Sequence, residues 1–180
     1  MLMRFARKFA RAKSGIAATE FALIAPLMIT IYFGITELCD ALTANMKATG
    51  VASAAADLIA QKKIITNSDK DDVFAAVNAL MYPYPTDPSM KIVVSSLIDN
   101  GNGTVKVAWS DAQHTTARTV NSIVTIPSGL VTSGGGGSVI LAEISYDYSS
   151  PAGHLIYGSF TMTDKFYEKP RQAAQISRTP

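Results

Sequence analysis

The sequence predicts an α+β protein in which a long N-terminal transmembrane helix continues into a head with a short helix and an antiparallel sheet of about four strands. Three observations lead to this prediction. The run Phe21–Thr36 contains no charged residue. Apolar residues recur at helical spacing after Ser68. Four later segments, between residues 91 and 167, are rich in β-branched and aromatic residues and are separated by turn-forming residues.

The first element is the membrane helix, predicted over Ile16–Cys39. These 24 residues make about 36 Å of helix, and a bilayer core needs about 20 apolar residues. Pro26 is tolerated inside such a helix, usually with a kink. Five basic residues and no acidic residue precede Gly15. The positive-inside rule therefore predicts a cytoplasmic N-terminus and an external domain after Asp40.

Glu20 is the unusual residue of this segment. A carboxylate in hydrocarbon costs a few kcal/mol unless it finds a partner, so it suggests a function; at the cytoplasmic interface it would simply stay hydrated. The residues Gly15 to Phe21, GIAATEF, resemble a prepilin peptidase site. In such sites cleavage follows the glycine, and a glutamate is the fifth residue of the mature chain. Here Ile16 would become the new terminus, and its amine could pair with Glu20 of a neighbouring subunit.

The wider segment GIAATEFALIAPLMITIYFGITEL resembles the start of TadE-like proteins, which are minor, pseudopilin-like components of the tight-adherence (Flp pilus) secretion system. The segments Pro127–Leu130, Val139–Tyr148 and Tyr167–Arg171 are similar to later parts of that family. Residues 62–126 match no motif of the family.

The resemblance implies a minor pseudopilin of the bacterial inner membrane with a periplasmic head, cleaved after Gly15 and acting in the initiation or anchoring of pilus assembly. Its implied partners are prepilin peptidase, other minor pseudopilins, the major Flp pilin, an inner-membrane assembly platform and the lipid bilayer. Glu20 and Phe21 would serve peptidase recognition and assembly. Ala18, Ala22 and Ala25, beside Pro26, would permit close helix contacts. Entry into the fibre and methylation of Ile16 are left open.

The predicted domains follow from these elements in chain order. They are a basic leader (1–15), the transmembrane helix (16–39), its periplasmic extension (40–62), an α+β head (63–170) and a polar tail (171–180), which we expect to be loose. In the extension an alanine recurs every fourth residue, and this ridge allows close approach of the protein's own sheet or of a neighbouring helix. In pilin-like proteins the head rests on this half of the helix, which favours the first arrangement. The ridge comprises Ala44, Ala48, Ala52, Ala56 and Ala60.

Within the head, Ser68 is the expected N-cap of a helix over Asp69–Met81. The predicted strands cover residues 91–98, 104–110, 138–148 and 160–167, with a hairpin turn over 99–103 and a flexible glycine-rich loop over 134–137. Residues 113–126 are ambiguous, because their composition favours extended chain but allows a short helix over residues 117–123.

Composition excludes several classes of function. Without the leader, 11 basic residues face 14 acidic residues, so a nucleic-acid-binding face is not expected. Cys39 is the only cysteine, and the head must therefore be stabilised by packing alone. His114 and His154 have no companions at metal-ligand spacing. We expect no enzymatic activity, metal or cofactor.

Two alternatives remain at this point. The chain could be an uncleaved, signal-anchored membrane protein with an extracytoplasmic binding domain, in which case Gly15 would be dispensable. It could also be a secreted protein cut after Ala44, although the apolar run is too long for a usual signal peptide.

Overall fold

The computed structural model describes residues 14–99, 104–131, 137–150 and 159–180. The basic leader up to residue 13, most of the predicted 99–103 turn, the glycine-rich loop up to residue 136 and His154 lie outside the described residues. The chain forms two compact units, residues 1–40 and 41–180.

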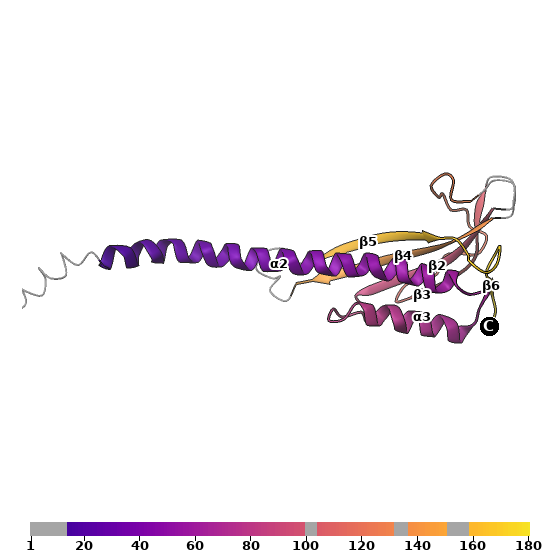
Figure 1. The fold of residues 1–180 in the computed structure, drawn as a ribbon, viewed down its shortest axis with the longest axis horizontal. Helices are drawn as coiled ribbons and strands as arrows, with labels where there is room; N and C mark the ends of the chain where they lie inside the picture. Colours follow the sequence, from indigo (N-terminus) through magenta and orange to yellow (C-terminus); the bar gives the residue numbers. More distant parts are fainter. Residues whose placement is uncertain (1–13, 100–103, 132–136, 151–158) are drawn as a thin grey trace, which may run out of the picture. The chain divides into compact units, whose positions relative to one another are not determined.

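Helix α2 (Ser14–Ala60) contributes to both units (Figure 1). It is 47 residues long and contains Pro26. The predicted membrane helix and its extension are thus one continuous helix, which ends two residues before the predicted boundary. Its apolar stretch belongs to the first unit, and its alanine-rich stretch belongs to the second.

Helix α3 (Asn67–Leu80) confirms the predicted short helix, but its N-cap was wrongly predicted. Thr66, rather than Ser68, accepts a hydrogen bond from the backbone N–H of Asp69, and the Asp69 side chain accepts one from the backbone N–H of Thr66. This reciprocal capping box satisfies two backbone donors that the first turn would otherwise leave unpaired. Lys62 also binds Asp69, with Nζ 2.8 Å from Oδ1. Ser68 lies inside the first turn.

The predicted four-stranded antiparallel sheet is confirmed. Its strands are β2 (Met90–Asp99), β3 (Val105–Gln113), β4 (Ser138–Ser149) and β5 (Ser159–Glu168), in the order β3-β2-β4-β5. The pairs Ile92–Ile144 and Ile144–Asp164 define the register of β4 against its two neighbours, β2 and β5.

The main core lies between one face of this sheet and the two helices. From α2, Ala44, Ala48, Ala52 and Ala56 are at most 2% exposed and share one hydrophobic cluster with the sheet. The ridge therefore packs on the protein's own sheet, as predicted. Strand β4 contributes every second residue, as expected for one buried face of a strand; these residues are Ile140, Ala142, Ile144, Tyr146 and Tyr148.

A smaller hydrophobic cluster lies on the opposite face and joins Leu97, Val107, Val139 and Leu141 to Val124 of the following loop. The loop is held by an antiparallel bridge between Lys106 and Ile123 and contains no helix between residues 114 and 131. The extended interpretation of this ambiguous region is thus correct, and the short helix does not form.

The C-terminal tail is not loose, contrary to the expectation from its polar composition. Strand β6 (Ser177–Arg178) pairs in parallel with β1 (Ile64–Ile65). Ile176 is 2% exposed in the main core, and its carbonyl accepts a 2.7 Å hydrogen bond from Trp109 Nε1. The buried Ile176 side chain and the backbone pairing of β6 fix the tail, although most of its residues are polar or small.

The capping box generates a stability prediction. We expect Thr66→Ala to destabilise the head by about 1 kcal/mol, because the N-terminal turn of α3 loses its side-chain acceptor. The matched variant Ser68→Ala should leave stability nearly unchanged, since Ser68 is exposed and accepts no capping bond. Denaturant unfolding of the detergent-solubilised protein, followed by the fluorescence of its only tryptophan, Trp109, measures both. Equal losses in the two variants would contradict the assignment of the cap.

Candidate functional site

The predicted processing residues lie at the start of α2. Gly15 and Ile16 are the second and third residues of α2 that the structure describes. Residues 15–21 are all exposed, with Ile16 at 60% and Phe21 at 68%. A methyl group added at Gly15 would meet nothing within 4 Å. The peptide bond after Gly15 is therefore not blocked by other described residues.

The stretch of α2 that follows is apolar on all sides. Within the described part of the chain, α2 is the one helix long and apolar enough to cross a membrane. Large apolar side chains around its circumference are more than half exposed, which in water would be strongly unfavourable. This arrangement is compatible with a single-pass membrane anchor. The exposed residues include Leu23, Ile24, Leu27, Met28, Ile31, Phe33 and Ile35.

The predicted contact residues fall on two different sides of the helix. At about 100° per residue, Ala18, Ala22 and Ala25 share one side. Glu20 lies nearly opposite them, on the side that also carries Ile16. Pro26 has no N–H to donate to the carbonyl of Ala22, so this carbonyl lacks its usual intrahelical donor. The structure therefore brings the three alanines together and separates them from Glu20.

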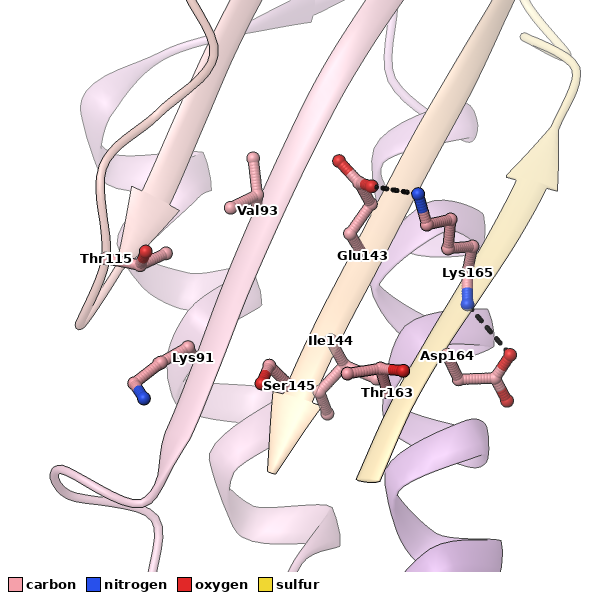
Figure 2. Close-up of a pocket in the computed structure, with 9 residues that line it drawn as sticks. All are labelled: Lys91, Val93, Thr115, Glu143, Ile144, Ser145, Thr163, Asp164 and Lys165. Carbon is pink, nitrogen blue, oxygen red and sulfur yellow. Dashed lines mark hydrogen bonds and ion pairs between the residues drawn. The ribbon is translucent and has the colours of Figure 1, made fainter. Parts of the chain in front are cut away.

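A second polar site lies on the sheet face opposite the helices, and the sequence did not predict it. A hollow of about 340 Å³ is lined by Lys91, Val93, Thr115, Glu143, Ile144, Ser145, Thr163, Asp164 and Lys165 (Figure 2). Glu143 is central to it. Arg118 binds its carboxylate in a bidentate manner, at 2.6 and 2.9 Å, and Lys165 Nζ lies 2.8 Å from Oε1.

Glu143 and Lys91, which line this hollow, are both paired with oppositely charged side chains. Burial raises the pKa of Glu143, but the hydrogen bonds from Arg118 and Lys165 outweigh it and hold the pKa below its usual range. Lys91 is likewise paired with Asp147, at 2.8 Å. Among the described residues, no group of three or more His, Cys, Asp or Glu side chains could hold a metal ion. The cluster thus joins β4, β5 and the loop after β3, which is a structural role.

The Glu143 cluster generates a pH prediction. Because the pKa of Glu143 is lower in the folded state than in the unfolded state, its ionised form stabilises the fold at pH values above the unfolded pKa, about 4.3. This stabilisation is lost as the pH falls through the folded pKa. Glu143→Gln should destabilise the protein at pH 7, and its deficit relative to the parent should shrink below pH 4. Asp71→Asn is the control, since the Asp71 side chain is 70% exposed. Trp109-detected unfolding over a pH series provides the measurement; a deficit independent of pH would contradict the ion-pair assignment.

A family model described as TadE-like protein matches residues 15–57. The match begins at the predicted cleavage glycine and covers both the apolar and most of the alanine-rich stretch of α2. Comparison with curated proteins and with solved structures gives no match. The later resemblances, between residues 127 and 171, stay predictions. Over residues 15–57, the chain matches the TadE-like family that its N-terminal motif resembles.

Proposed function

We propose that this protein is a component of a tight-adherence pilus system, a minor pseudopilin anchored in the bacterial inner membrane by α2. The observation that carries the proposal is the family match over residues 15–57, which coincides with a helix whose exposed apolar stretch can span a bilayer. The basic leader before Gly15 supports a cytoplasmic N-terminus and a periplasmic head by the positive-inside rule. In this role the protein is a structural component and a peptidase substrate.

The processing step would hydrolyse the peptide bond between Gly15 and Ile16. Two features support it: the GIAATEF motif and the exposure of the surrounding residues. Cleavage converts the amide nitrogen of Ile16 into a charged terminal amine. It also removes the basic leader, whose positive charge otherwise holds this end at the cytoplasmic face.

The new amine and Glu20 give the mature helix one positive and one negative group near the same end. Both lie on the same side of α2, opposite the alanines. In an assembly, Glu20 of one subunit can neutralise the terminal amine of another, which offsets the cost of keeping either charge in an apolar environment. The alanine side remains available for a separate, close helix contact with a minor pseudopilin, the major pilin or the assembly platform.

The alternatives are less compatible with the chain. A cut after Ala44 would remove that alanine from the head core, where it is 0% exposed. An uncleaved signal anchor needs the apolar stretch but gives no role to Gly15 and Glu20. It is therefore the second candidate, and cleavage of the leader after Gly15 distinguishes the first candidate from it.

Processing is tested by the mass of the mature N-terminus. We expect a chain that begins at Ile16 only when the cognate prepilin peptidase is present and residue 15 is glycine. Gly15→Ala, which meets no steric conflict in the fold, should leave the leader in place. A parent protein that keeps its leader in the presence of active peptidase would favour the uncleaved anchor, and a start at Asn45 would indicate a signal peptide.

The role of Glu20 is tested independently of cleavage. Among Glu20→Ala molecules that mass spectrometry shows to begin at Ile16, we expect a loss of assembly, seen as a loss of surface pili and of co-purification with the other pilus subunits, because the terminal amine lacks its partner. Leu23→Ala is the control, since Leu23 is exposed on nearly the same side of the helix but carries no charge. Normal piliation with Glu20→Ala would exclude the pairing role.

A further inference from the structure

The C-terminal tail, residues 171–180, occupies a groove at the end of the head where α2 ends and α3 begins (Figure 1). The residues that receive the tail offer it two backbone carbonyls, an apolar side chain, an indole N–H and two side-chain acceptors. We call them the tail groove: Lys63, Ile65, Asn67, Trp109 and Asp111. Several neighbouring tail residues thus meet a different kind of contact each, which is what recognition of a sequence requires.

Ile176 is the apolar anchor of the tail. It is the only buried residue among the ten tail residues, at 2% exposed, and it belongs to the same hydrophobic cluster as Ile65 and Trp109. Its carbonyl accepts the 2.7 Å hydrogen bond from Trp109 Nε1. The groove therefore favours a large apolar residue at this position, because a smaller one would leave apolar surface of the groove uncovered.

Arg178, two residues later, is the charged anchor. Its Nε lies 2.8 Å from Oδ2 of Asp111 and its Nη2 lies 3.3 Å from Oδ1, and Nη2 also donates to the side-chain oxygen of Asn67. The side chains of Arg178 and Asp111 are only 18 and 19% exposed. A guanidinium presents its donors in a fixed, planar arrangement that a lysine ammonium does not reproduce. The groove thus reads an isoleucine and, two residues on, an arginine.

Backbone pairing sets the direction of the tail in the groove. Strand β6 runs parallel to β1, and the N–H groups of Ser177 and Thr179 donate to the carbonyls of Lys63 and Ile65 at 3.4 and 2.9 Å. Peptides that bind by adding a strand use the same division of labour, in which main-chain hydrogen bonds give affinity and side-chain contacts give specificity. The tail is thus held in the way that a bound peptide is held.

We propose that the tail groove is a binding site for the sequence Ile-x-Arg, which is filled here by the chain's own tail and can take the tail of a second copy. The tail is a chain end whose last residue, Pro180, is exposed, so it can leave the groove without threading through the fold. A chain's own tail has a high effective concentration at its groove, so exchange is favoured only where copies are crowded. Crowding in an assembly rests on the proposed function, whereas recognition of the tail does not.

Recognition is tested with a synthetic peptide of residues 171–180 added to two detergent-solubilised proteins. One protein ends at Pro170, and the other is the full chain with Ile176→Ser. Trp109 is the reporter, since it is the only tryptophan and lies in the groove, 7% exposed. We expect the peptide to shift the Trp109 emission of both proteins to shorter wavelength in a saturable manner. The emission of the parent protein should not change, because its groove is filled.

Variant peptides test which residues the groove reads. Peptides with Ile176→Ala or Arg178→Lys should bind at least about tenfold more weakly, and a peptide with Gln172→Ala, an exposed position, should bind as the parent peptide does. Equal binding of all four peptides, or no binding to proteins whose circular dichroism shows them folded, would overturn the proposal. Loss of the fold in both proteins would also overturn it, because the tail would then be part of the core and not a bound segment.

Exchange between copies is tested by reconstituting two chains in the same lipid vesicles. One chain ends at Pro170, and the other is full-length with Trp109→Phe, so it gives no tryptophan emission. We expect the full-length chain to shift the Trp109 emission of the shortened chain to shorter wavelength, and a Trp109→Phe chain that also ends at Pro170 to cause no shift. Absence of the shift, although the peptide binds and both chains float with the vesicles, would overturn exchange. Chains that do not float would overturn the membrane anchor, and exchange within a membrane with it, while the peptide result would stand.

Discussion

The head depends on the close approach of α2 to the β-sheet, which only small side chains allow. Ala44, Ala48, Ala52 and Ala56 are almost completely buried and lie in one cluster with the inner face of the sheet. A larger residue at any of them would separate helix and sheet, because the core is already filled. With one cysteine and no intramolecular disulfide available, this packing is what holds the head on its helix.

One helix therefore satisfies two different environments. Its first stretch carries exposed apolar side chains on every side, which lipid can solvate, and its second stretch buries a narrow alanine face against protein. The family match spans both stretches, from residue 15 to residue 57. The matched residues lie wholly within α2 and include Glu20, the apolar stretch and most of the alanine ridge.

Patterns with a local period could be predicted from the sequence, and features set by distant partners could not. The uncharged run, the four-residue alanine spacing and the β-branched segments identified α2, its buried ridge and the four main strands. Thr66 was missed as the cap although Asp69 follows it by three residues, which is a recognisable capping-box spacing. Strands β1 and β6 have two residues each and pair although they lie at opposite ends of the head sequence. Arg118 and Lys165, which bind Glu143, are distant from it in sequence. The only local signal was an acid within the otherwise apolar run Val139–Ile144.

The most direct test of this account is hydrogen–deuterium exchange of the full-length protein in lipid nanodiscs, with increasing urea. The account predicts that peptides from residues 41–60 lose protection together with the Trp109 unfolding transition, because their stability comes from packing on the sheet. Peptides from residues 16–39 should stay protected, because lipid stabilises them. Loss of protection in both stretches at the same urea concentration, or protection of residues 41–60 after the head has unfolded, would contradict the division of α2 into a lipid-solvated and a protein-packed half.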